Sequence, residues 1–443
     1  MIIKNIGELV GIVPEGVLRK CGAEMSEVGI LRNAWLRIED GRIADFGSQE
    51  TASAPEDSAQ LRFAPAPPTD SVSGPLPLPV SGGGHASGVL AVSRLDSEVI
   101  DAEGGMVMPA FCDSHTHVVY AGSREGEFRD KIAGLSYEEI AARGGGILNS
   151  ADLLHETSEE ELYRQAMVRV REMMAAGTGA MEIKSGYGLN PADELKMLRV
   201  IRRIRESVPA VVRSTFLGAH AVGRGYTHDA YVREVIDMMP EAAELADFVD
   251  VFCDEGFFTP EDTDRILTAG SACGLRAKIH ANELAVSGGV EVGVRHGALS
   301  VDHLERTTPA QIEALRGSGT MPTMLPGSSF FLGIPFGDAK GFIGAGLPLA
   351  LASDYNPGSS PSGDMRFVMA LACIRMRLTP EQAFNAATLN SAYAMGVSTE
   401  TGSVTAGKRA NLILTEPGWN LTRLAYNYST PYVRRVILGG VVL

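Results

Sequence analysis

Short apolar runs alternate with amphipathic segments through most of the chain. The segments between the runs have helical spacing: apolar residues recur every four positions from Leu162 to Met174, which puts them on one face of a helix. The apolar runs themselves are short enough to be buried strands. Eight of them end near His117, Lys184, His220, Asp254, His280, His303, Pro326 and Asp354.

Polar residues mark where several of the intervening helices begin. SEEE at Ser158 predicts a capping box. A cap residue followed by proline, the other common start signal, occurs at Asn190, Thr259, Thr308 and Thr379. Eight βα units within residues 106–396 favour a closed parallel barrel over an open doubly wound sheet. We therefore predict an α/β fold whose main domain, 106–396, is a TIM-like (β/α)8 barrel.

Both ends of the chain have strand patterns instead. Residues 29–48 predict two short strands joined by a turn at Asp40-Gly41, and NLILTE and VRRVILGGVVL close the chain. We expect residues 1–105 and 397–443 to form one small β-rich accessory domain. Within it, residues 51–93 are rich in Pro, Ser and Gly and have no periodicity, which predicts a mobile surface insertion.

Charge and cysteine content narrow the class of protein. The 443 residues include 39 Lys plus Arg and 54 Asp plus Glu, which gives a formal net charge of −15. The sequence has no basic stripe, so binding to nucleic acid is not expected. The five cysteines form no CxxC pair, which is typical of reduced thiols. The start resembles no signal peptide, and no apolar stretch reaches the ~20 residues that cross a bilayer. We expect a soluble cytoplasmic protein without membrane contact.

Four residues at the predicted strand ends suggest a metal site. Active sites of such barrels lie at the C-terminal ends of the strands. His115 and His117 are two residues apart, so both imidazoles can face the barrel mouth, where His280 and Asp354 also stand. A lone HxH is weak evidence, and a single His or Asp at a strand end can cap a helix. The agreement of four residues favours a nitrogen-rich site for zinc or iron.

Further residues at the mouth can serve catalysis. A metal ion lowers the pKa of its bound water to ~7, and hydrolysis then needs a base, an electrophile and an acid. Asp354, His303 and Glu283 are candidates for these roles, and their division stays open.

Another set can bind substrate. Arg124 can hold a carboxylate, although an ion pair with Glu125 or Glu127 is the alternative. Tyr187 and His220 follow the second and third strands. The NPGSS sequence can form a tight turn that ends the strand. Its residues Asn356, Gly358 and Ser359 can bind substrate as well, and the two interpretations are compatible.

Several of these sequences resemble a known superfamily. DSHTH, HANE, VDHLE and LASDYNPGSS resemble the amidohydrolases, and KSGYG, LGAHAV and SDYNPGSSP resemble its imidazolonepropionase family. The resemblance implies hydrolysis of the cyclic amide bond of 4-imidazolone-5-propanoate to N-formimidoyl-L-glutamate in histidine degradation. It also implies that the accessory domain is a β-sandwich built from both termini. The alternatives are another amidohydrolase acting on a small cyclic amide or heterocycle, as hydrolase or deaminase, and a barrel that has lost catalysis.

The resemblance assigns roles to individual residues. It implies metal ligands at His115, His117, His280 and Asp354. It implies substrate contacts at Arg124, which would hold the propionate, and at Tyr187, His220, Glu283, Asn356, Gly358 and Ser359, with His303 in the catalytic pocket. The fourth strand ends without the lysine that bridges two metals in other amidohydrolases, so one zinc or iron ion is expected. A homodimer is expected by analogy.

The chain also departs from the family pattern. Leu154-His155 stands where a Thr-Arg pair is expected after GGGI, and Gly223-Arg224-Gly225 where prolines are expected. Asn411 occupies a position that is Asp in many amidohydrolases. The insertion at 51–93 is longer than expected. None of these departures touches the implied metal ligands.

Overall fold

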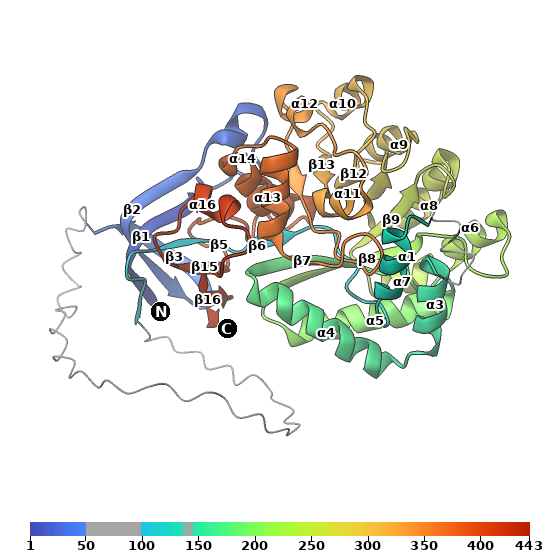
Figure 1. Cartoon of the computed structure of the whole chain (residues 1–443), viewed down its shortest axis with the longest axis horizontal. Coiled ribbons are helices and arrows are strands. Elements are labelled where there is room, and N and C mark those ends of the chain that lie inside the picture. The colour runs from blue at the N-terminus through green and yellow to red at the C-terminus, as the bar shows by residue number, and fades with distance from the viewer. Residues whose placement is uncertain (50–98, 136–138, 140–144) are drawn as a thin grey trace.

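The computed structural model describes residues 1–49, 99–135, 139 and 145–443 (Figure 1). The predicted insertion at 51–93 lies outside these residues. The larger domain is a barrel of eight parallel strands, each hydrogen-bonded to the next along the chain, with a short extra strand, β10 (Arg276–Ala277), on β9. The eight are β6 (Phe111–Asp113), β7 (Thr178–Lys184), β8 (Val211–Ala219), β9 (Phe248–Cys253), β11 (Ile279–Ala281), β12 (Ser300–His303), β13 (Met321–Met324) and β14 (Ala350–Leu351).

The first and last strands meet just beyond their ends. Thr116 and Tyr355 form a parallel bridge, and the amide of Asp354 donates to the carbonyl of His115 at 3.0 Å. Below this bridge the amide of Ser353 donates to Asp113 at 3.0 Å. The strands β6 and β14 end before this bridge, at Asp113 and Leu351, and are shorter than predicted. The predicted site residues His115, His117 and Asp354 follow these strands instead of lying on them. Closure at this point brings the two ends of the barrel sequence side by side.

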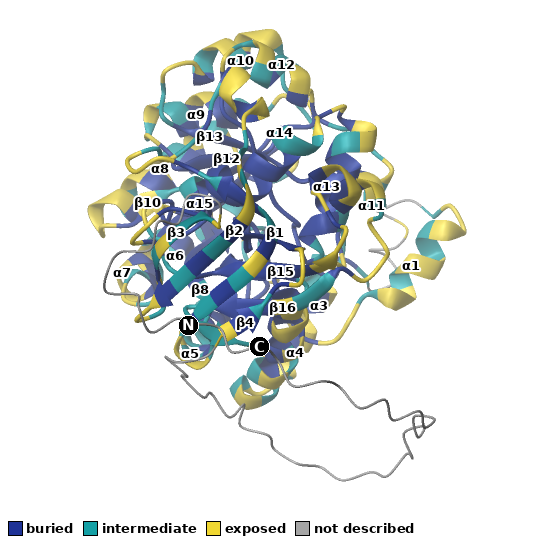
Figure 2. Ribbon diagram, turned by 90° about the vertical axis from the view of Figure 1, so that its left-hand side faces the viewer, coloured by how far each residue is buried: buried dark blue, intermediate teal, exposed yellow. Residues whose placement is uncertain are grey.

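Helices surround the barrel, with their exposed faces outward and the strands buried (Figure 2). The predicted caps are in place: Ser158, Asn190, Thr259 and Thr379 each accept a backbone amide of the first turn, and Thr308 precedes α10. The helices are α1 (Glu125–Ile132), α3 (Ile147–Glu156), α4 (Glu159–Ala175), α5 (Pro191–Ser207), α6 (His228–Asp237), α7 (Met239–Ala243), α8 (Pro260–Ala272), α9 (Gly289–Arg295), α10 (Pro309–Leu315), α11 (Pro326–Leu332), α12 (Ala339–Gly344), α13 (Met365–Arg375), α14 (Pro380–Asn385), α15 (Ser391–Ala394) and α16 (Leu421–Tyr426).

Both chain ends build the smaller domain, as predicted (Figure 1). Its strands form one eight-stranded sheet in which β5 pairs with both β1 and β15. The predicted turn joins β2 to β3, with positive φ at Asp40 (49°) and Gly41 (75°). The sheet folds back on itself, because the amide of Ala410 donates to the carbonyl of Gly41 at 2.8 Å. The strands are β1 (Ile2–Ile12), β2 (Gly29–Glu39), β3 (Arg42–Ser48), β4 (Val99–Asp101), β5 (Gly105–Pro109), β15 (Leu412–Pro417), β16 (Val433–Leu438) and β17 (Val441–Val442).

The two domains are joined by polar as well as apolar contacts. Asn411 is buried, donates to the carbonyl of Gly179 on β7 at 2.9 Å and accepts the amide of Gly439 at 2.8 Å. This departure from the family pattern thus ties the smaller domain to the second barrel strand. In the part of the chain that the structure describes, no helix has the length and apolar character needed to span a membrane.

Candidate metal centre and active site

The four predicted metal ligands come together at the mouth of the barrel. The Nε2 atoms of His115 and His117 lie 3.3 Å apart, and Oδ1 of Asp354 lies 3.6 Å from the first and 3.5 Å from the second. The ring of His280 lies 4.4 Å from that of His115, between centroids. All four side chains are buried. They come from β6, β11 and β14 or the residues just after them, so the fold brings together segments far apart in sequence.

The donors in this cluster fit a metal ion. His115, His117 and His280 each offer a ring nitrogen within 4.8 Å of the others. Nε2 of His280 is buried and has no hydrogen-bond partner among the described residues. Burial lowers the pKa of all three histidines, that of His280 to about 3. Neutral imidazoles keep a lone pair, which is the form that binds transition metals.

Two buried carboxylates hold these imidazoles from behind. Oδ2 of Asp302, on β12, lies 2.7 Å from Nδ1 of His115, and Oδ2 of Asp250, on β9, lies 3.0 Å from Nδ1 of His280. The first contact is a hydrogen bond, which fixes the ring of His115 so that Nε2 faces the site, as in many metal centres. The second is a close contact without hydrogen-bond geometry, but the backbone amide of His280 donates to Oδ1 of the same aspartate at 3.1 Å. Sequence reasoning had not singled out either aspartate.

A layer of buried charge lies under these aspartates. Lys184 contacts Glu182 and Asp250 through Nζ, and Lys278 contacts Glu182. Burial alone would lower the pKa of Lys184, but Asp250 and Glu182 raise it above its ordinary value. The signal for this layer was in the sequence. Glu182 and Lys184 are two apart on β7, so both side chains lie on the same face of that strand. Lys278 has the same spacing from His280 and immediately precedes β11.

His303 stands between two carboxylates. Its Nδ1 lies 3.7 Å from Oε2 of Glu283 and 3.7 Å from Oε2 of Glu305. Burial alone would lower the pKa of His303, but these carboxylates raise it to about 10. Burial raises the pKa of Glu283 to about 7, and the charges of Glu305 and Asp354 add to this rise. His303 also has a left-handed backbone, φ 83°, a strained conformation of the kind found at functional sites.

The loop that carries Glu283 is fixed by the fourth strand. Asp254 follows β9, and its carboxylate accepts the amides of Glu283, Leu284 and Ala285 at 2.8, 3.0 and 3.1 Å. Asp254 lies at the end of the fourth barrel strand, which lacks the lysine that bridges two metals in other amidohydrolases. It therefore acts through the backbone of the HANE segment.

The NPGSS segment forms a tight turn beside Asp354. Oδ1 of Asn356 accepts the amides of Gly358 and Ser359, both at 2.8 Å. The hydroxyl of Ser359 lies 3.2 Å from Oδ2 of Asp354. The turn interpretation is thus confirmed, and the same turn places a hydroxyl on the predicted metal ligand.

Arg124 caps the start of α1 and pairs with a carboxylate of its own helix. Its Nε and Nη2 donate to Oε2 of Glu127 at 2.9 and 2.6 Å, so the alternative ion pair is present. Its guanidinium also packs against Gly358, where any side chain would clash with Nη1. Arg124 therefore lies against the turn that follows Asp354.

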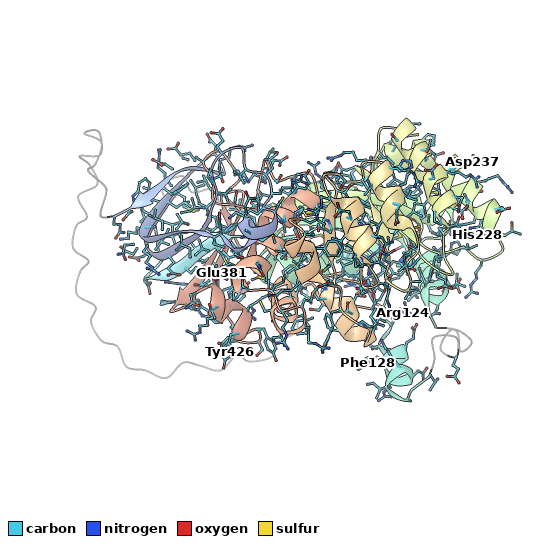
Figure 3. The ribbon with its side chains drawn as sticks, turned by 90° about the horizontal axis from the view of Figure 1, so that it is seen from above. Arg124, Phe128, His228, Asp237, Glu381 and Tyr426 are labelled. Atoms are coloured by element: carbon cyan, nitrogen blue, oxygen red, sulfur yellow. The ribbon has the colours of Figure 1, made fainter. Side chains whose placement is uncertain are left out.

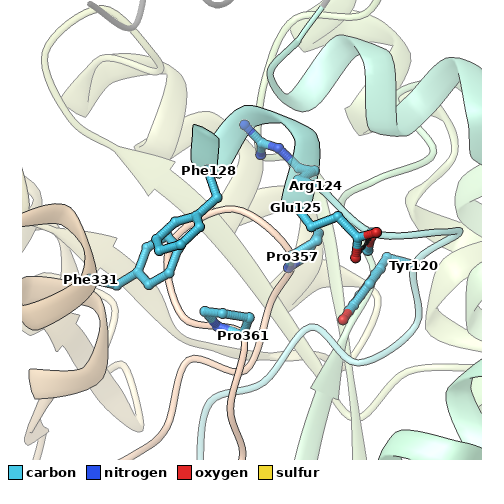
Figure 4. A pocket seen from close by; sticks show the side chains of 8 residues that line it. Tyr120, Arg124, Glu125, Phe128, Phe331, Pro357 and Pro361 are labelled. Atoms are coloured by element: carbon cyan, nitrogen blue, oxygen red, sulfur yellow. Dashed lines mark hydrogen bonds between the residues drawn. The ribbon is translucent and has the colours of Figure 1, made fainter. Parts of the chain in front are cut away.

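A hollow of about 310 Å³ opens beside Arg124. Figure 2 shows α1 standing out from the barrel, and Figure 3 labels Arg124 and Phe128 in this region. Figure 4 shows Phe128 next to Phe331 on one side of the hollow, with Tyr120 on the other. The two phenylalanine rings are stacked with centroids 5.5 Å apart. The other residues that line it are Tyr120, Ser123, Glu125, Pro357 and Pro361.

Tyr187 and His220 lie beside His117. The ring of His220 stacks on that of His117, with centroids 5.2 Å apart and planes at 16°, and Tyr187 lies 5.4 Å from His220. Nδ1 of His220 is 2.9 Å from the carbonyl of Gly186. The loop that holds Tyr187 is anchored by Glu194, which accepts the amides of Gly186, Gly188 and Leu189.

Two of the departures from the family pattern lie on or against α3. Leu154 and His155 are in α3, where Leu154 is buried and Nδ1 of His155 lies 2.7 Å from Asp193. Arg224, which follows β8, forms an ion pair at 2.9 Å with Asp152 of α3. Among the other histidines, His296 is the C-cap residue of α9.

Comparisons with known proteins bear on the fold and the family. Residues 276–443 match the model of the amidohydrolase family. The fold is similar to a triazine hydrolase variant (TM-score 0.71, 13% identity, 100% of this chain and 94% of that chain). It is also similar to 5-methylcytosine deaminase from Klebsiella pneumoniae (TM-score 0.69, 14% identity, 100% and 97%). At these identities the likeness concerns the fold alone.

Curated relatives extend over the whole chain. The imidazolonepropionase of Flavobacterium johnsoniae is 48% identical, covering 100% of this chain and 99% of the relative. That of Geobacillus kaustophilus is 39% identical, covering 100% and 97%. Amidohydrolases are metal-dependent enzymes that act on small molecules, and the buried His/Asp cluster suits that chemistry. The chain belongs to the imidazolonepropionase family of the amidohydrolases.

Proposed function

We propose that this chain hydrolyses the ring of 4-imidazolone-5-propanoate to give N-formimidoyl-L-glutamate, a step of histidine degradation. Water adds to the ring carbonyl carbon, the bond from that carbon to the ring nitrogen breaks, and the nitrogen leaves with a proton. The observation that supports this most is the turn after Asp354. It joins a predicted metal ligand to Arg124, a cation able to hold a substrate carboxylate.

The proposed metal site holds one zinc or iron ion between His115, His117, His280 and Asp354. Three imidazoles and one carboxylate suit either metal. When bound, the ion acts as a Lewis acid that makes water nucleophilic at neutral pH and polarises a carbonyl. The fourth strand supplies no lysine for a second ion, and Asp254 at its end is engaged with three backbone amides.

The acid and base roles are assigned to three groups. Asp354 accepts the proton of the attacking water on a carboxylate oxygen. His303, charged between Glu283 and Glu305, donates toward the carbonyl oxygen as negative charge develops there. Glu283, with a pKa raised to about 7, can take and give a proton at neutral pH and so serves the leaving nitrogen.

The rest of the proposed site binds substrate. Arg124 holds the propionate, which requires its guanidinium to share or leave the carboxylate of Glu127. The remaining contacts to the ring and its substituents are assigned to Tyr187, His220, Asn356, Gly358 and Ser359. We further propose that the protein is a cytoplasmic homodimer. Its ligand is the small-molecule substrate, and it binds neither nucleic acid nor membranes.

Purified protein should consume freshly generated 4-imidazolone-5-propanoate, followed as loss of its ultraviolet absorbance. Removal of metal with a chelator should stop the reaction, and zinc or iron should restore it. An analogue of the ring without the propionate is the control and should react much more slowly. Absence of turnover by metal-loaded protein would overturn the proposed substrate.

His280→Ala should remove metal and activity together, because it deletes one of the donors in the cluster. Metal per chain, measured by elemental analysis after desalting, should fall from about one to near zero. The control is His228→Ala, since His228 pairs with Asp262 outside the cluster. A metal-free His280→Ala protein that still turned over substrate would contradict the proposed site.

Arg124→Ala should raise KM by about 10–100-fold and change kcat less. A charge-assisted hydrogen bond to a carboxylate contributes ~1.5–3 kcal/mol, and the propionate is remote from the bond that breaks. Arg129→Ala, an exposed arginine on the same helix, is the control. An unchanged KM for Arg124→Ala would rule out its role in holding the propionate.

Glu283→Gln should lower kcat by about 10²–10⁴-fold while metal content stays at the level of the unmodified protein. A positioned proton-transfer group contributes a factor of this order, and Glu283 is not one of the proposed ligands. Steady-state kinetics and elemental analysis on the same sample separate the two effects, with exposed Glu255→Gln as control. Near-normal kcat would remove Glu283 from the proton path.

A further inference from the structure

Two of the candidate metal-binding imidazoles are linked through one buried ammonium group. Nζ of Lys184, on β7, lies 2.8 Å from Oδ2 of Asp250 on β9 and 3.9 Å from Oδ2 of Asp302 on β12. These same two oxygens face Nδ1 of His280 at 3.0 Å and Nδ1 of His115 at 2.7 Å. One cation therefore contacts both carboxylates that hold imidazoles on opposite sides of the barrel.

The charges around Lys184 form a closed set. Glu182 contacts Lys184 at 2.5 Å, and Lys278 contacts Glu182, donates to the carbonyl of Ser114 at 2.8 Å and lies 3.7 Å from Asp302. All five side chains are fully buried. Three carboxylates and two ammonium groups leave a net charge of −1 in this layer. Loss of one ammonium would leave two negative charges in excess where water is excluded, an arrangement that is strongly unfavourable.

We propose that Lys184 is a positioning residue for the metal centre, which holds Asp250 and Asp302 so that they orient His280 and His115. This inference rests on the proposed metal site and not on the proposed substrate. Lys184 is not itself a ligand, since its Nζ is occupied by Glu182 and Asp250. Without it, the two carboxylates would turn toward the nearest remaining positive group, and the two imidazoles would lose their fixed orientation.

Lys184→Met keeps the length of the side chain and removes its charge. In metal-stripped protein the affinity for Zn²⁺, measured by competition with a chromogenic chelator, should fall by about 10–100-fold, the range for partners of metal ligands. The visible absorption of bound Co²⁺ should change as well, because it reports ligand geometry. Lys408→Met is the control: Lys408 is also buried, but it bonds to Ser403 in the smaller domain.

Two further variants test the route of the effect. Lys184→Arg keeps the charge and should retain more Zn²⁺ affinity than Lys184→Met. If Lys184 acts through Asp302, the losses in Lys184→Met and Asp302→Asn should not multiply in the double variant. Should circular dichroism show that Lys184→Met does not fold, Lys184→Gln, which also removes the positive charge, takes its place with the same expected loss of Zn²⁺ affinity.

The outcomes separate this inference from the proposed function. Folded Lys184→Met with unchanged or tighter Zn²⁺ binding and an unchanged Co²⁺ spectrum would overturn the positioning role. So would a parent protein that binds no metal. A parent protein that binds metal but does not consume 4-imidazolone-5-propanoate would overturn the proposed substrate and leave the role of Lys184 standing.

Discussion

The contact between the first and last barrel strands is the constraint on which the site depends. The bridge between Thr116 and Tyr355 joins segments more than two hundred residues apart and sets His115 and His117 beside Asp354. Because the same closure continues into the NPGSS turn, it also brings Arg124 against Gly358. The metal cluster and the proposed carboxylate-binding residue are thus two consequences of one barrel closure.

Closure of the barrel alone does not explain why the imidazoles face inward. Their orientation depends on buried carboxylates, and burying a carboxylate is unfavourable unless a positive charge lies beside it. His115 and His280 each have an aspartate at Nδ1, and both aspartates share the cation of Lys184. A lone carboxylate in this interior would be strongly unfavourable. The imidazoles of His115 and His280 are therefore backed by carboxylates, and both carboxylates are backed by the ammonium group of Lys184 on another strand.

Sequence reasoning found the residues at the mouth but not the layer beneath them. Strand ends and cap residues are local signals, so the βα order, Ser158 and the four candidate ligands were predictable. The spacing of Glu182/Lys184 and of Lys278/His280 indicates that the two side chains of each pair lie on one face. Which of them meet across the barrel depends on the stagger of the strands, which no local pattern records. The partner of Arg124 was open for the same reason, because charge alone does not choose between Glu127 and a ligand.

The fold does not by itself distinguish this chain from other enzymes. Triazine hydrolase and 5-methylcytosine deaminase share the architecture at 13% and 14% identity. In the proposed site, the loops that meet the substrate are the start of α1 and the turn after Asp354. Arg124 is held by Glu127 at 2.6 Å in the structure. A substrate carboxylate must compete with this internal one, so neutral heterocycles, which cannot compete, gain nothing from the guanidinium. In the proposed site, the preference for a carboxylate-bearing ring therefore comes from the guanidinium of Arg124, and the ion pair with Glu127 reduces the free energy that a substrate carboxylate gains from it.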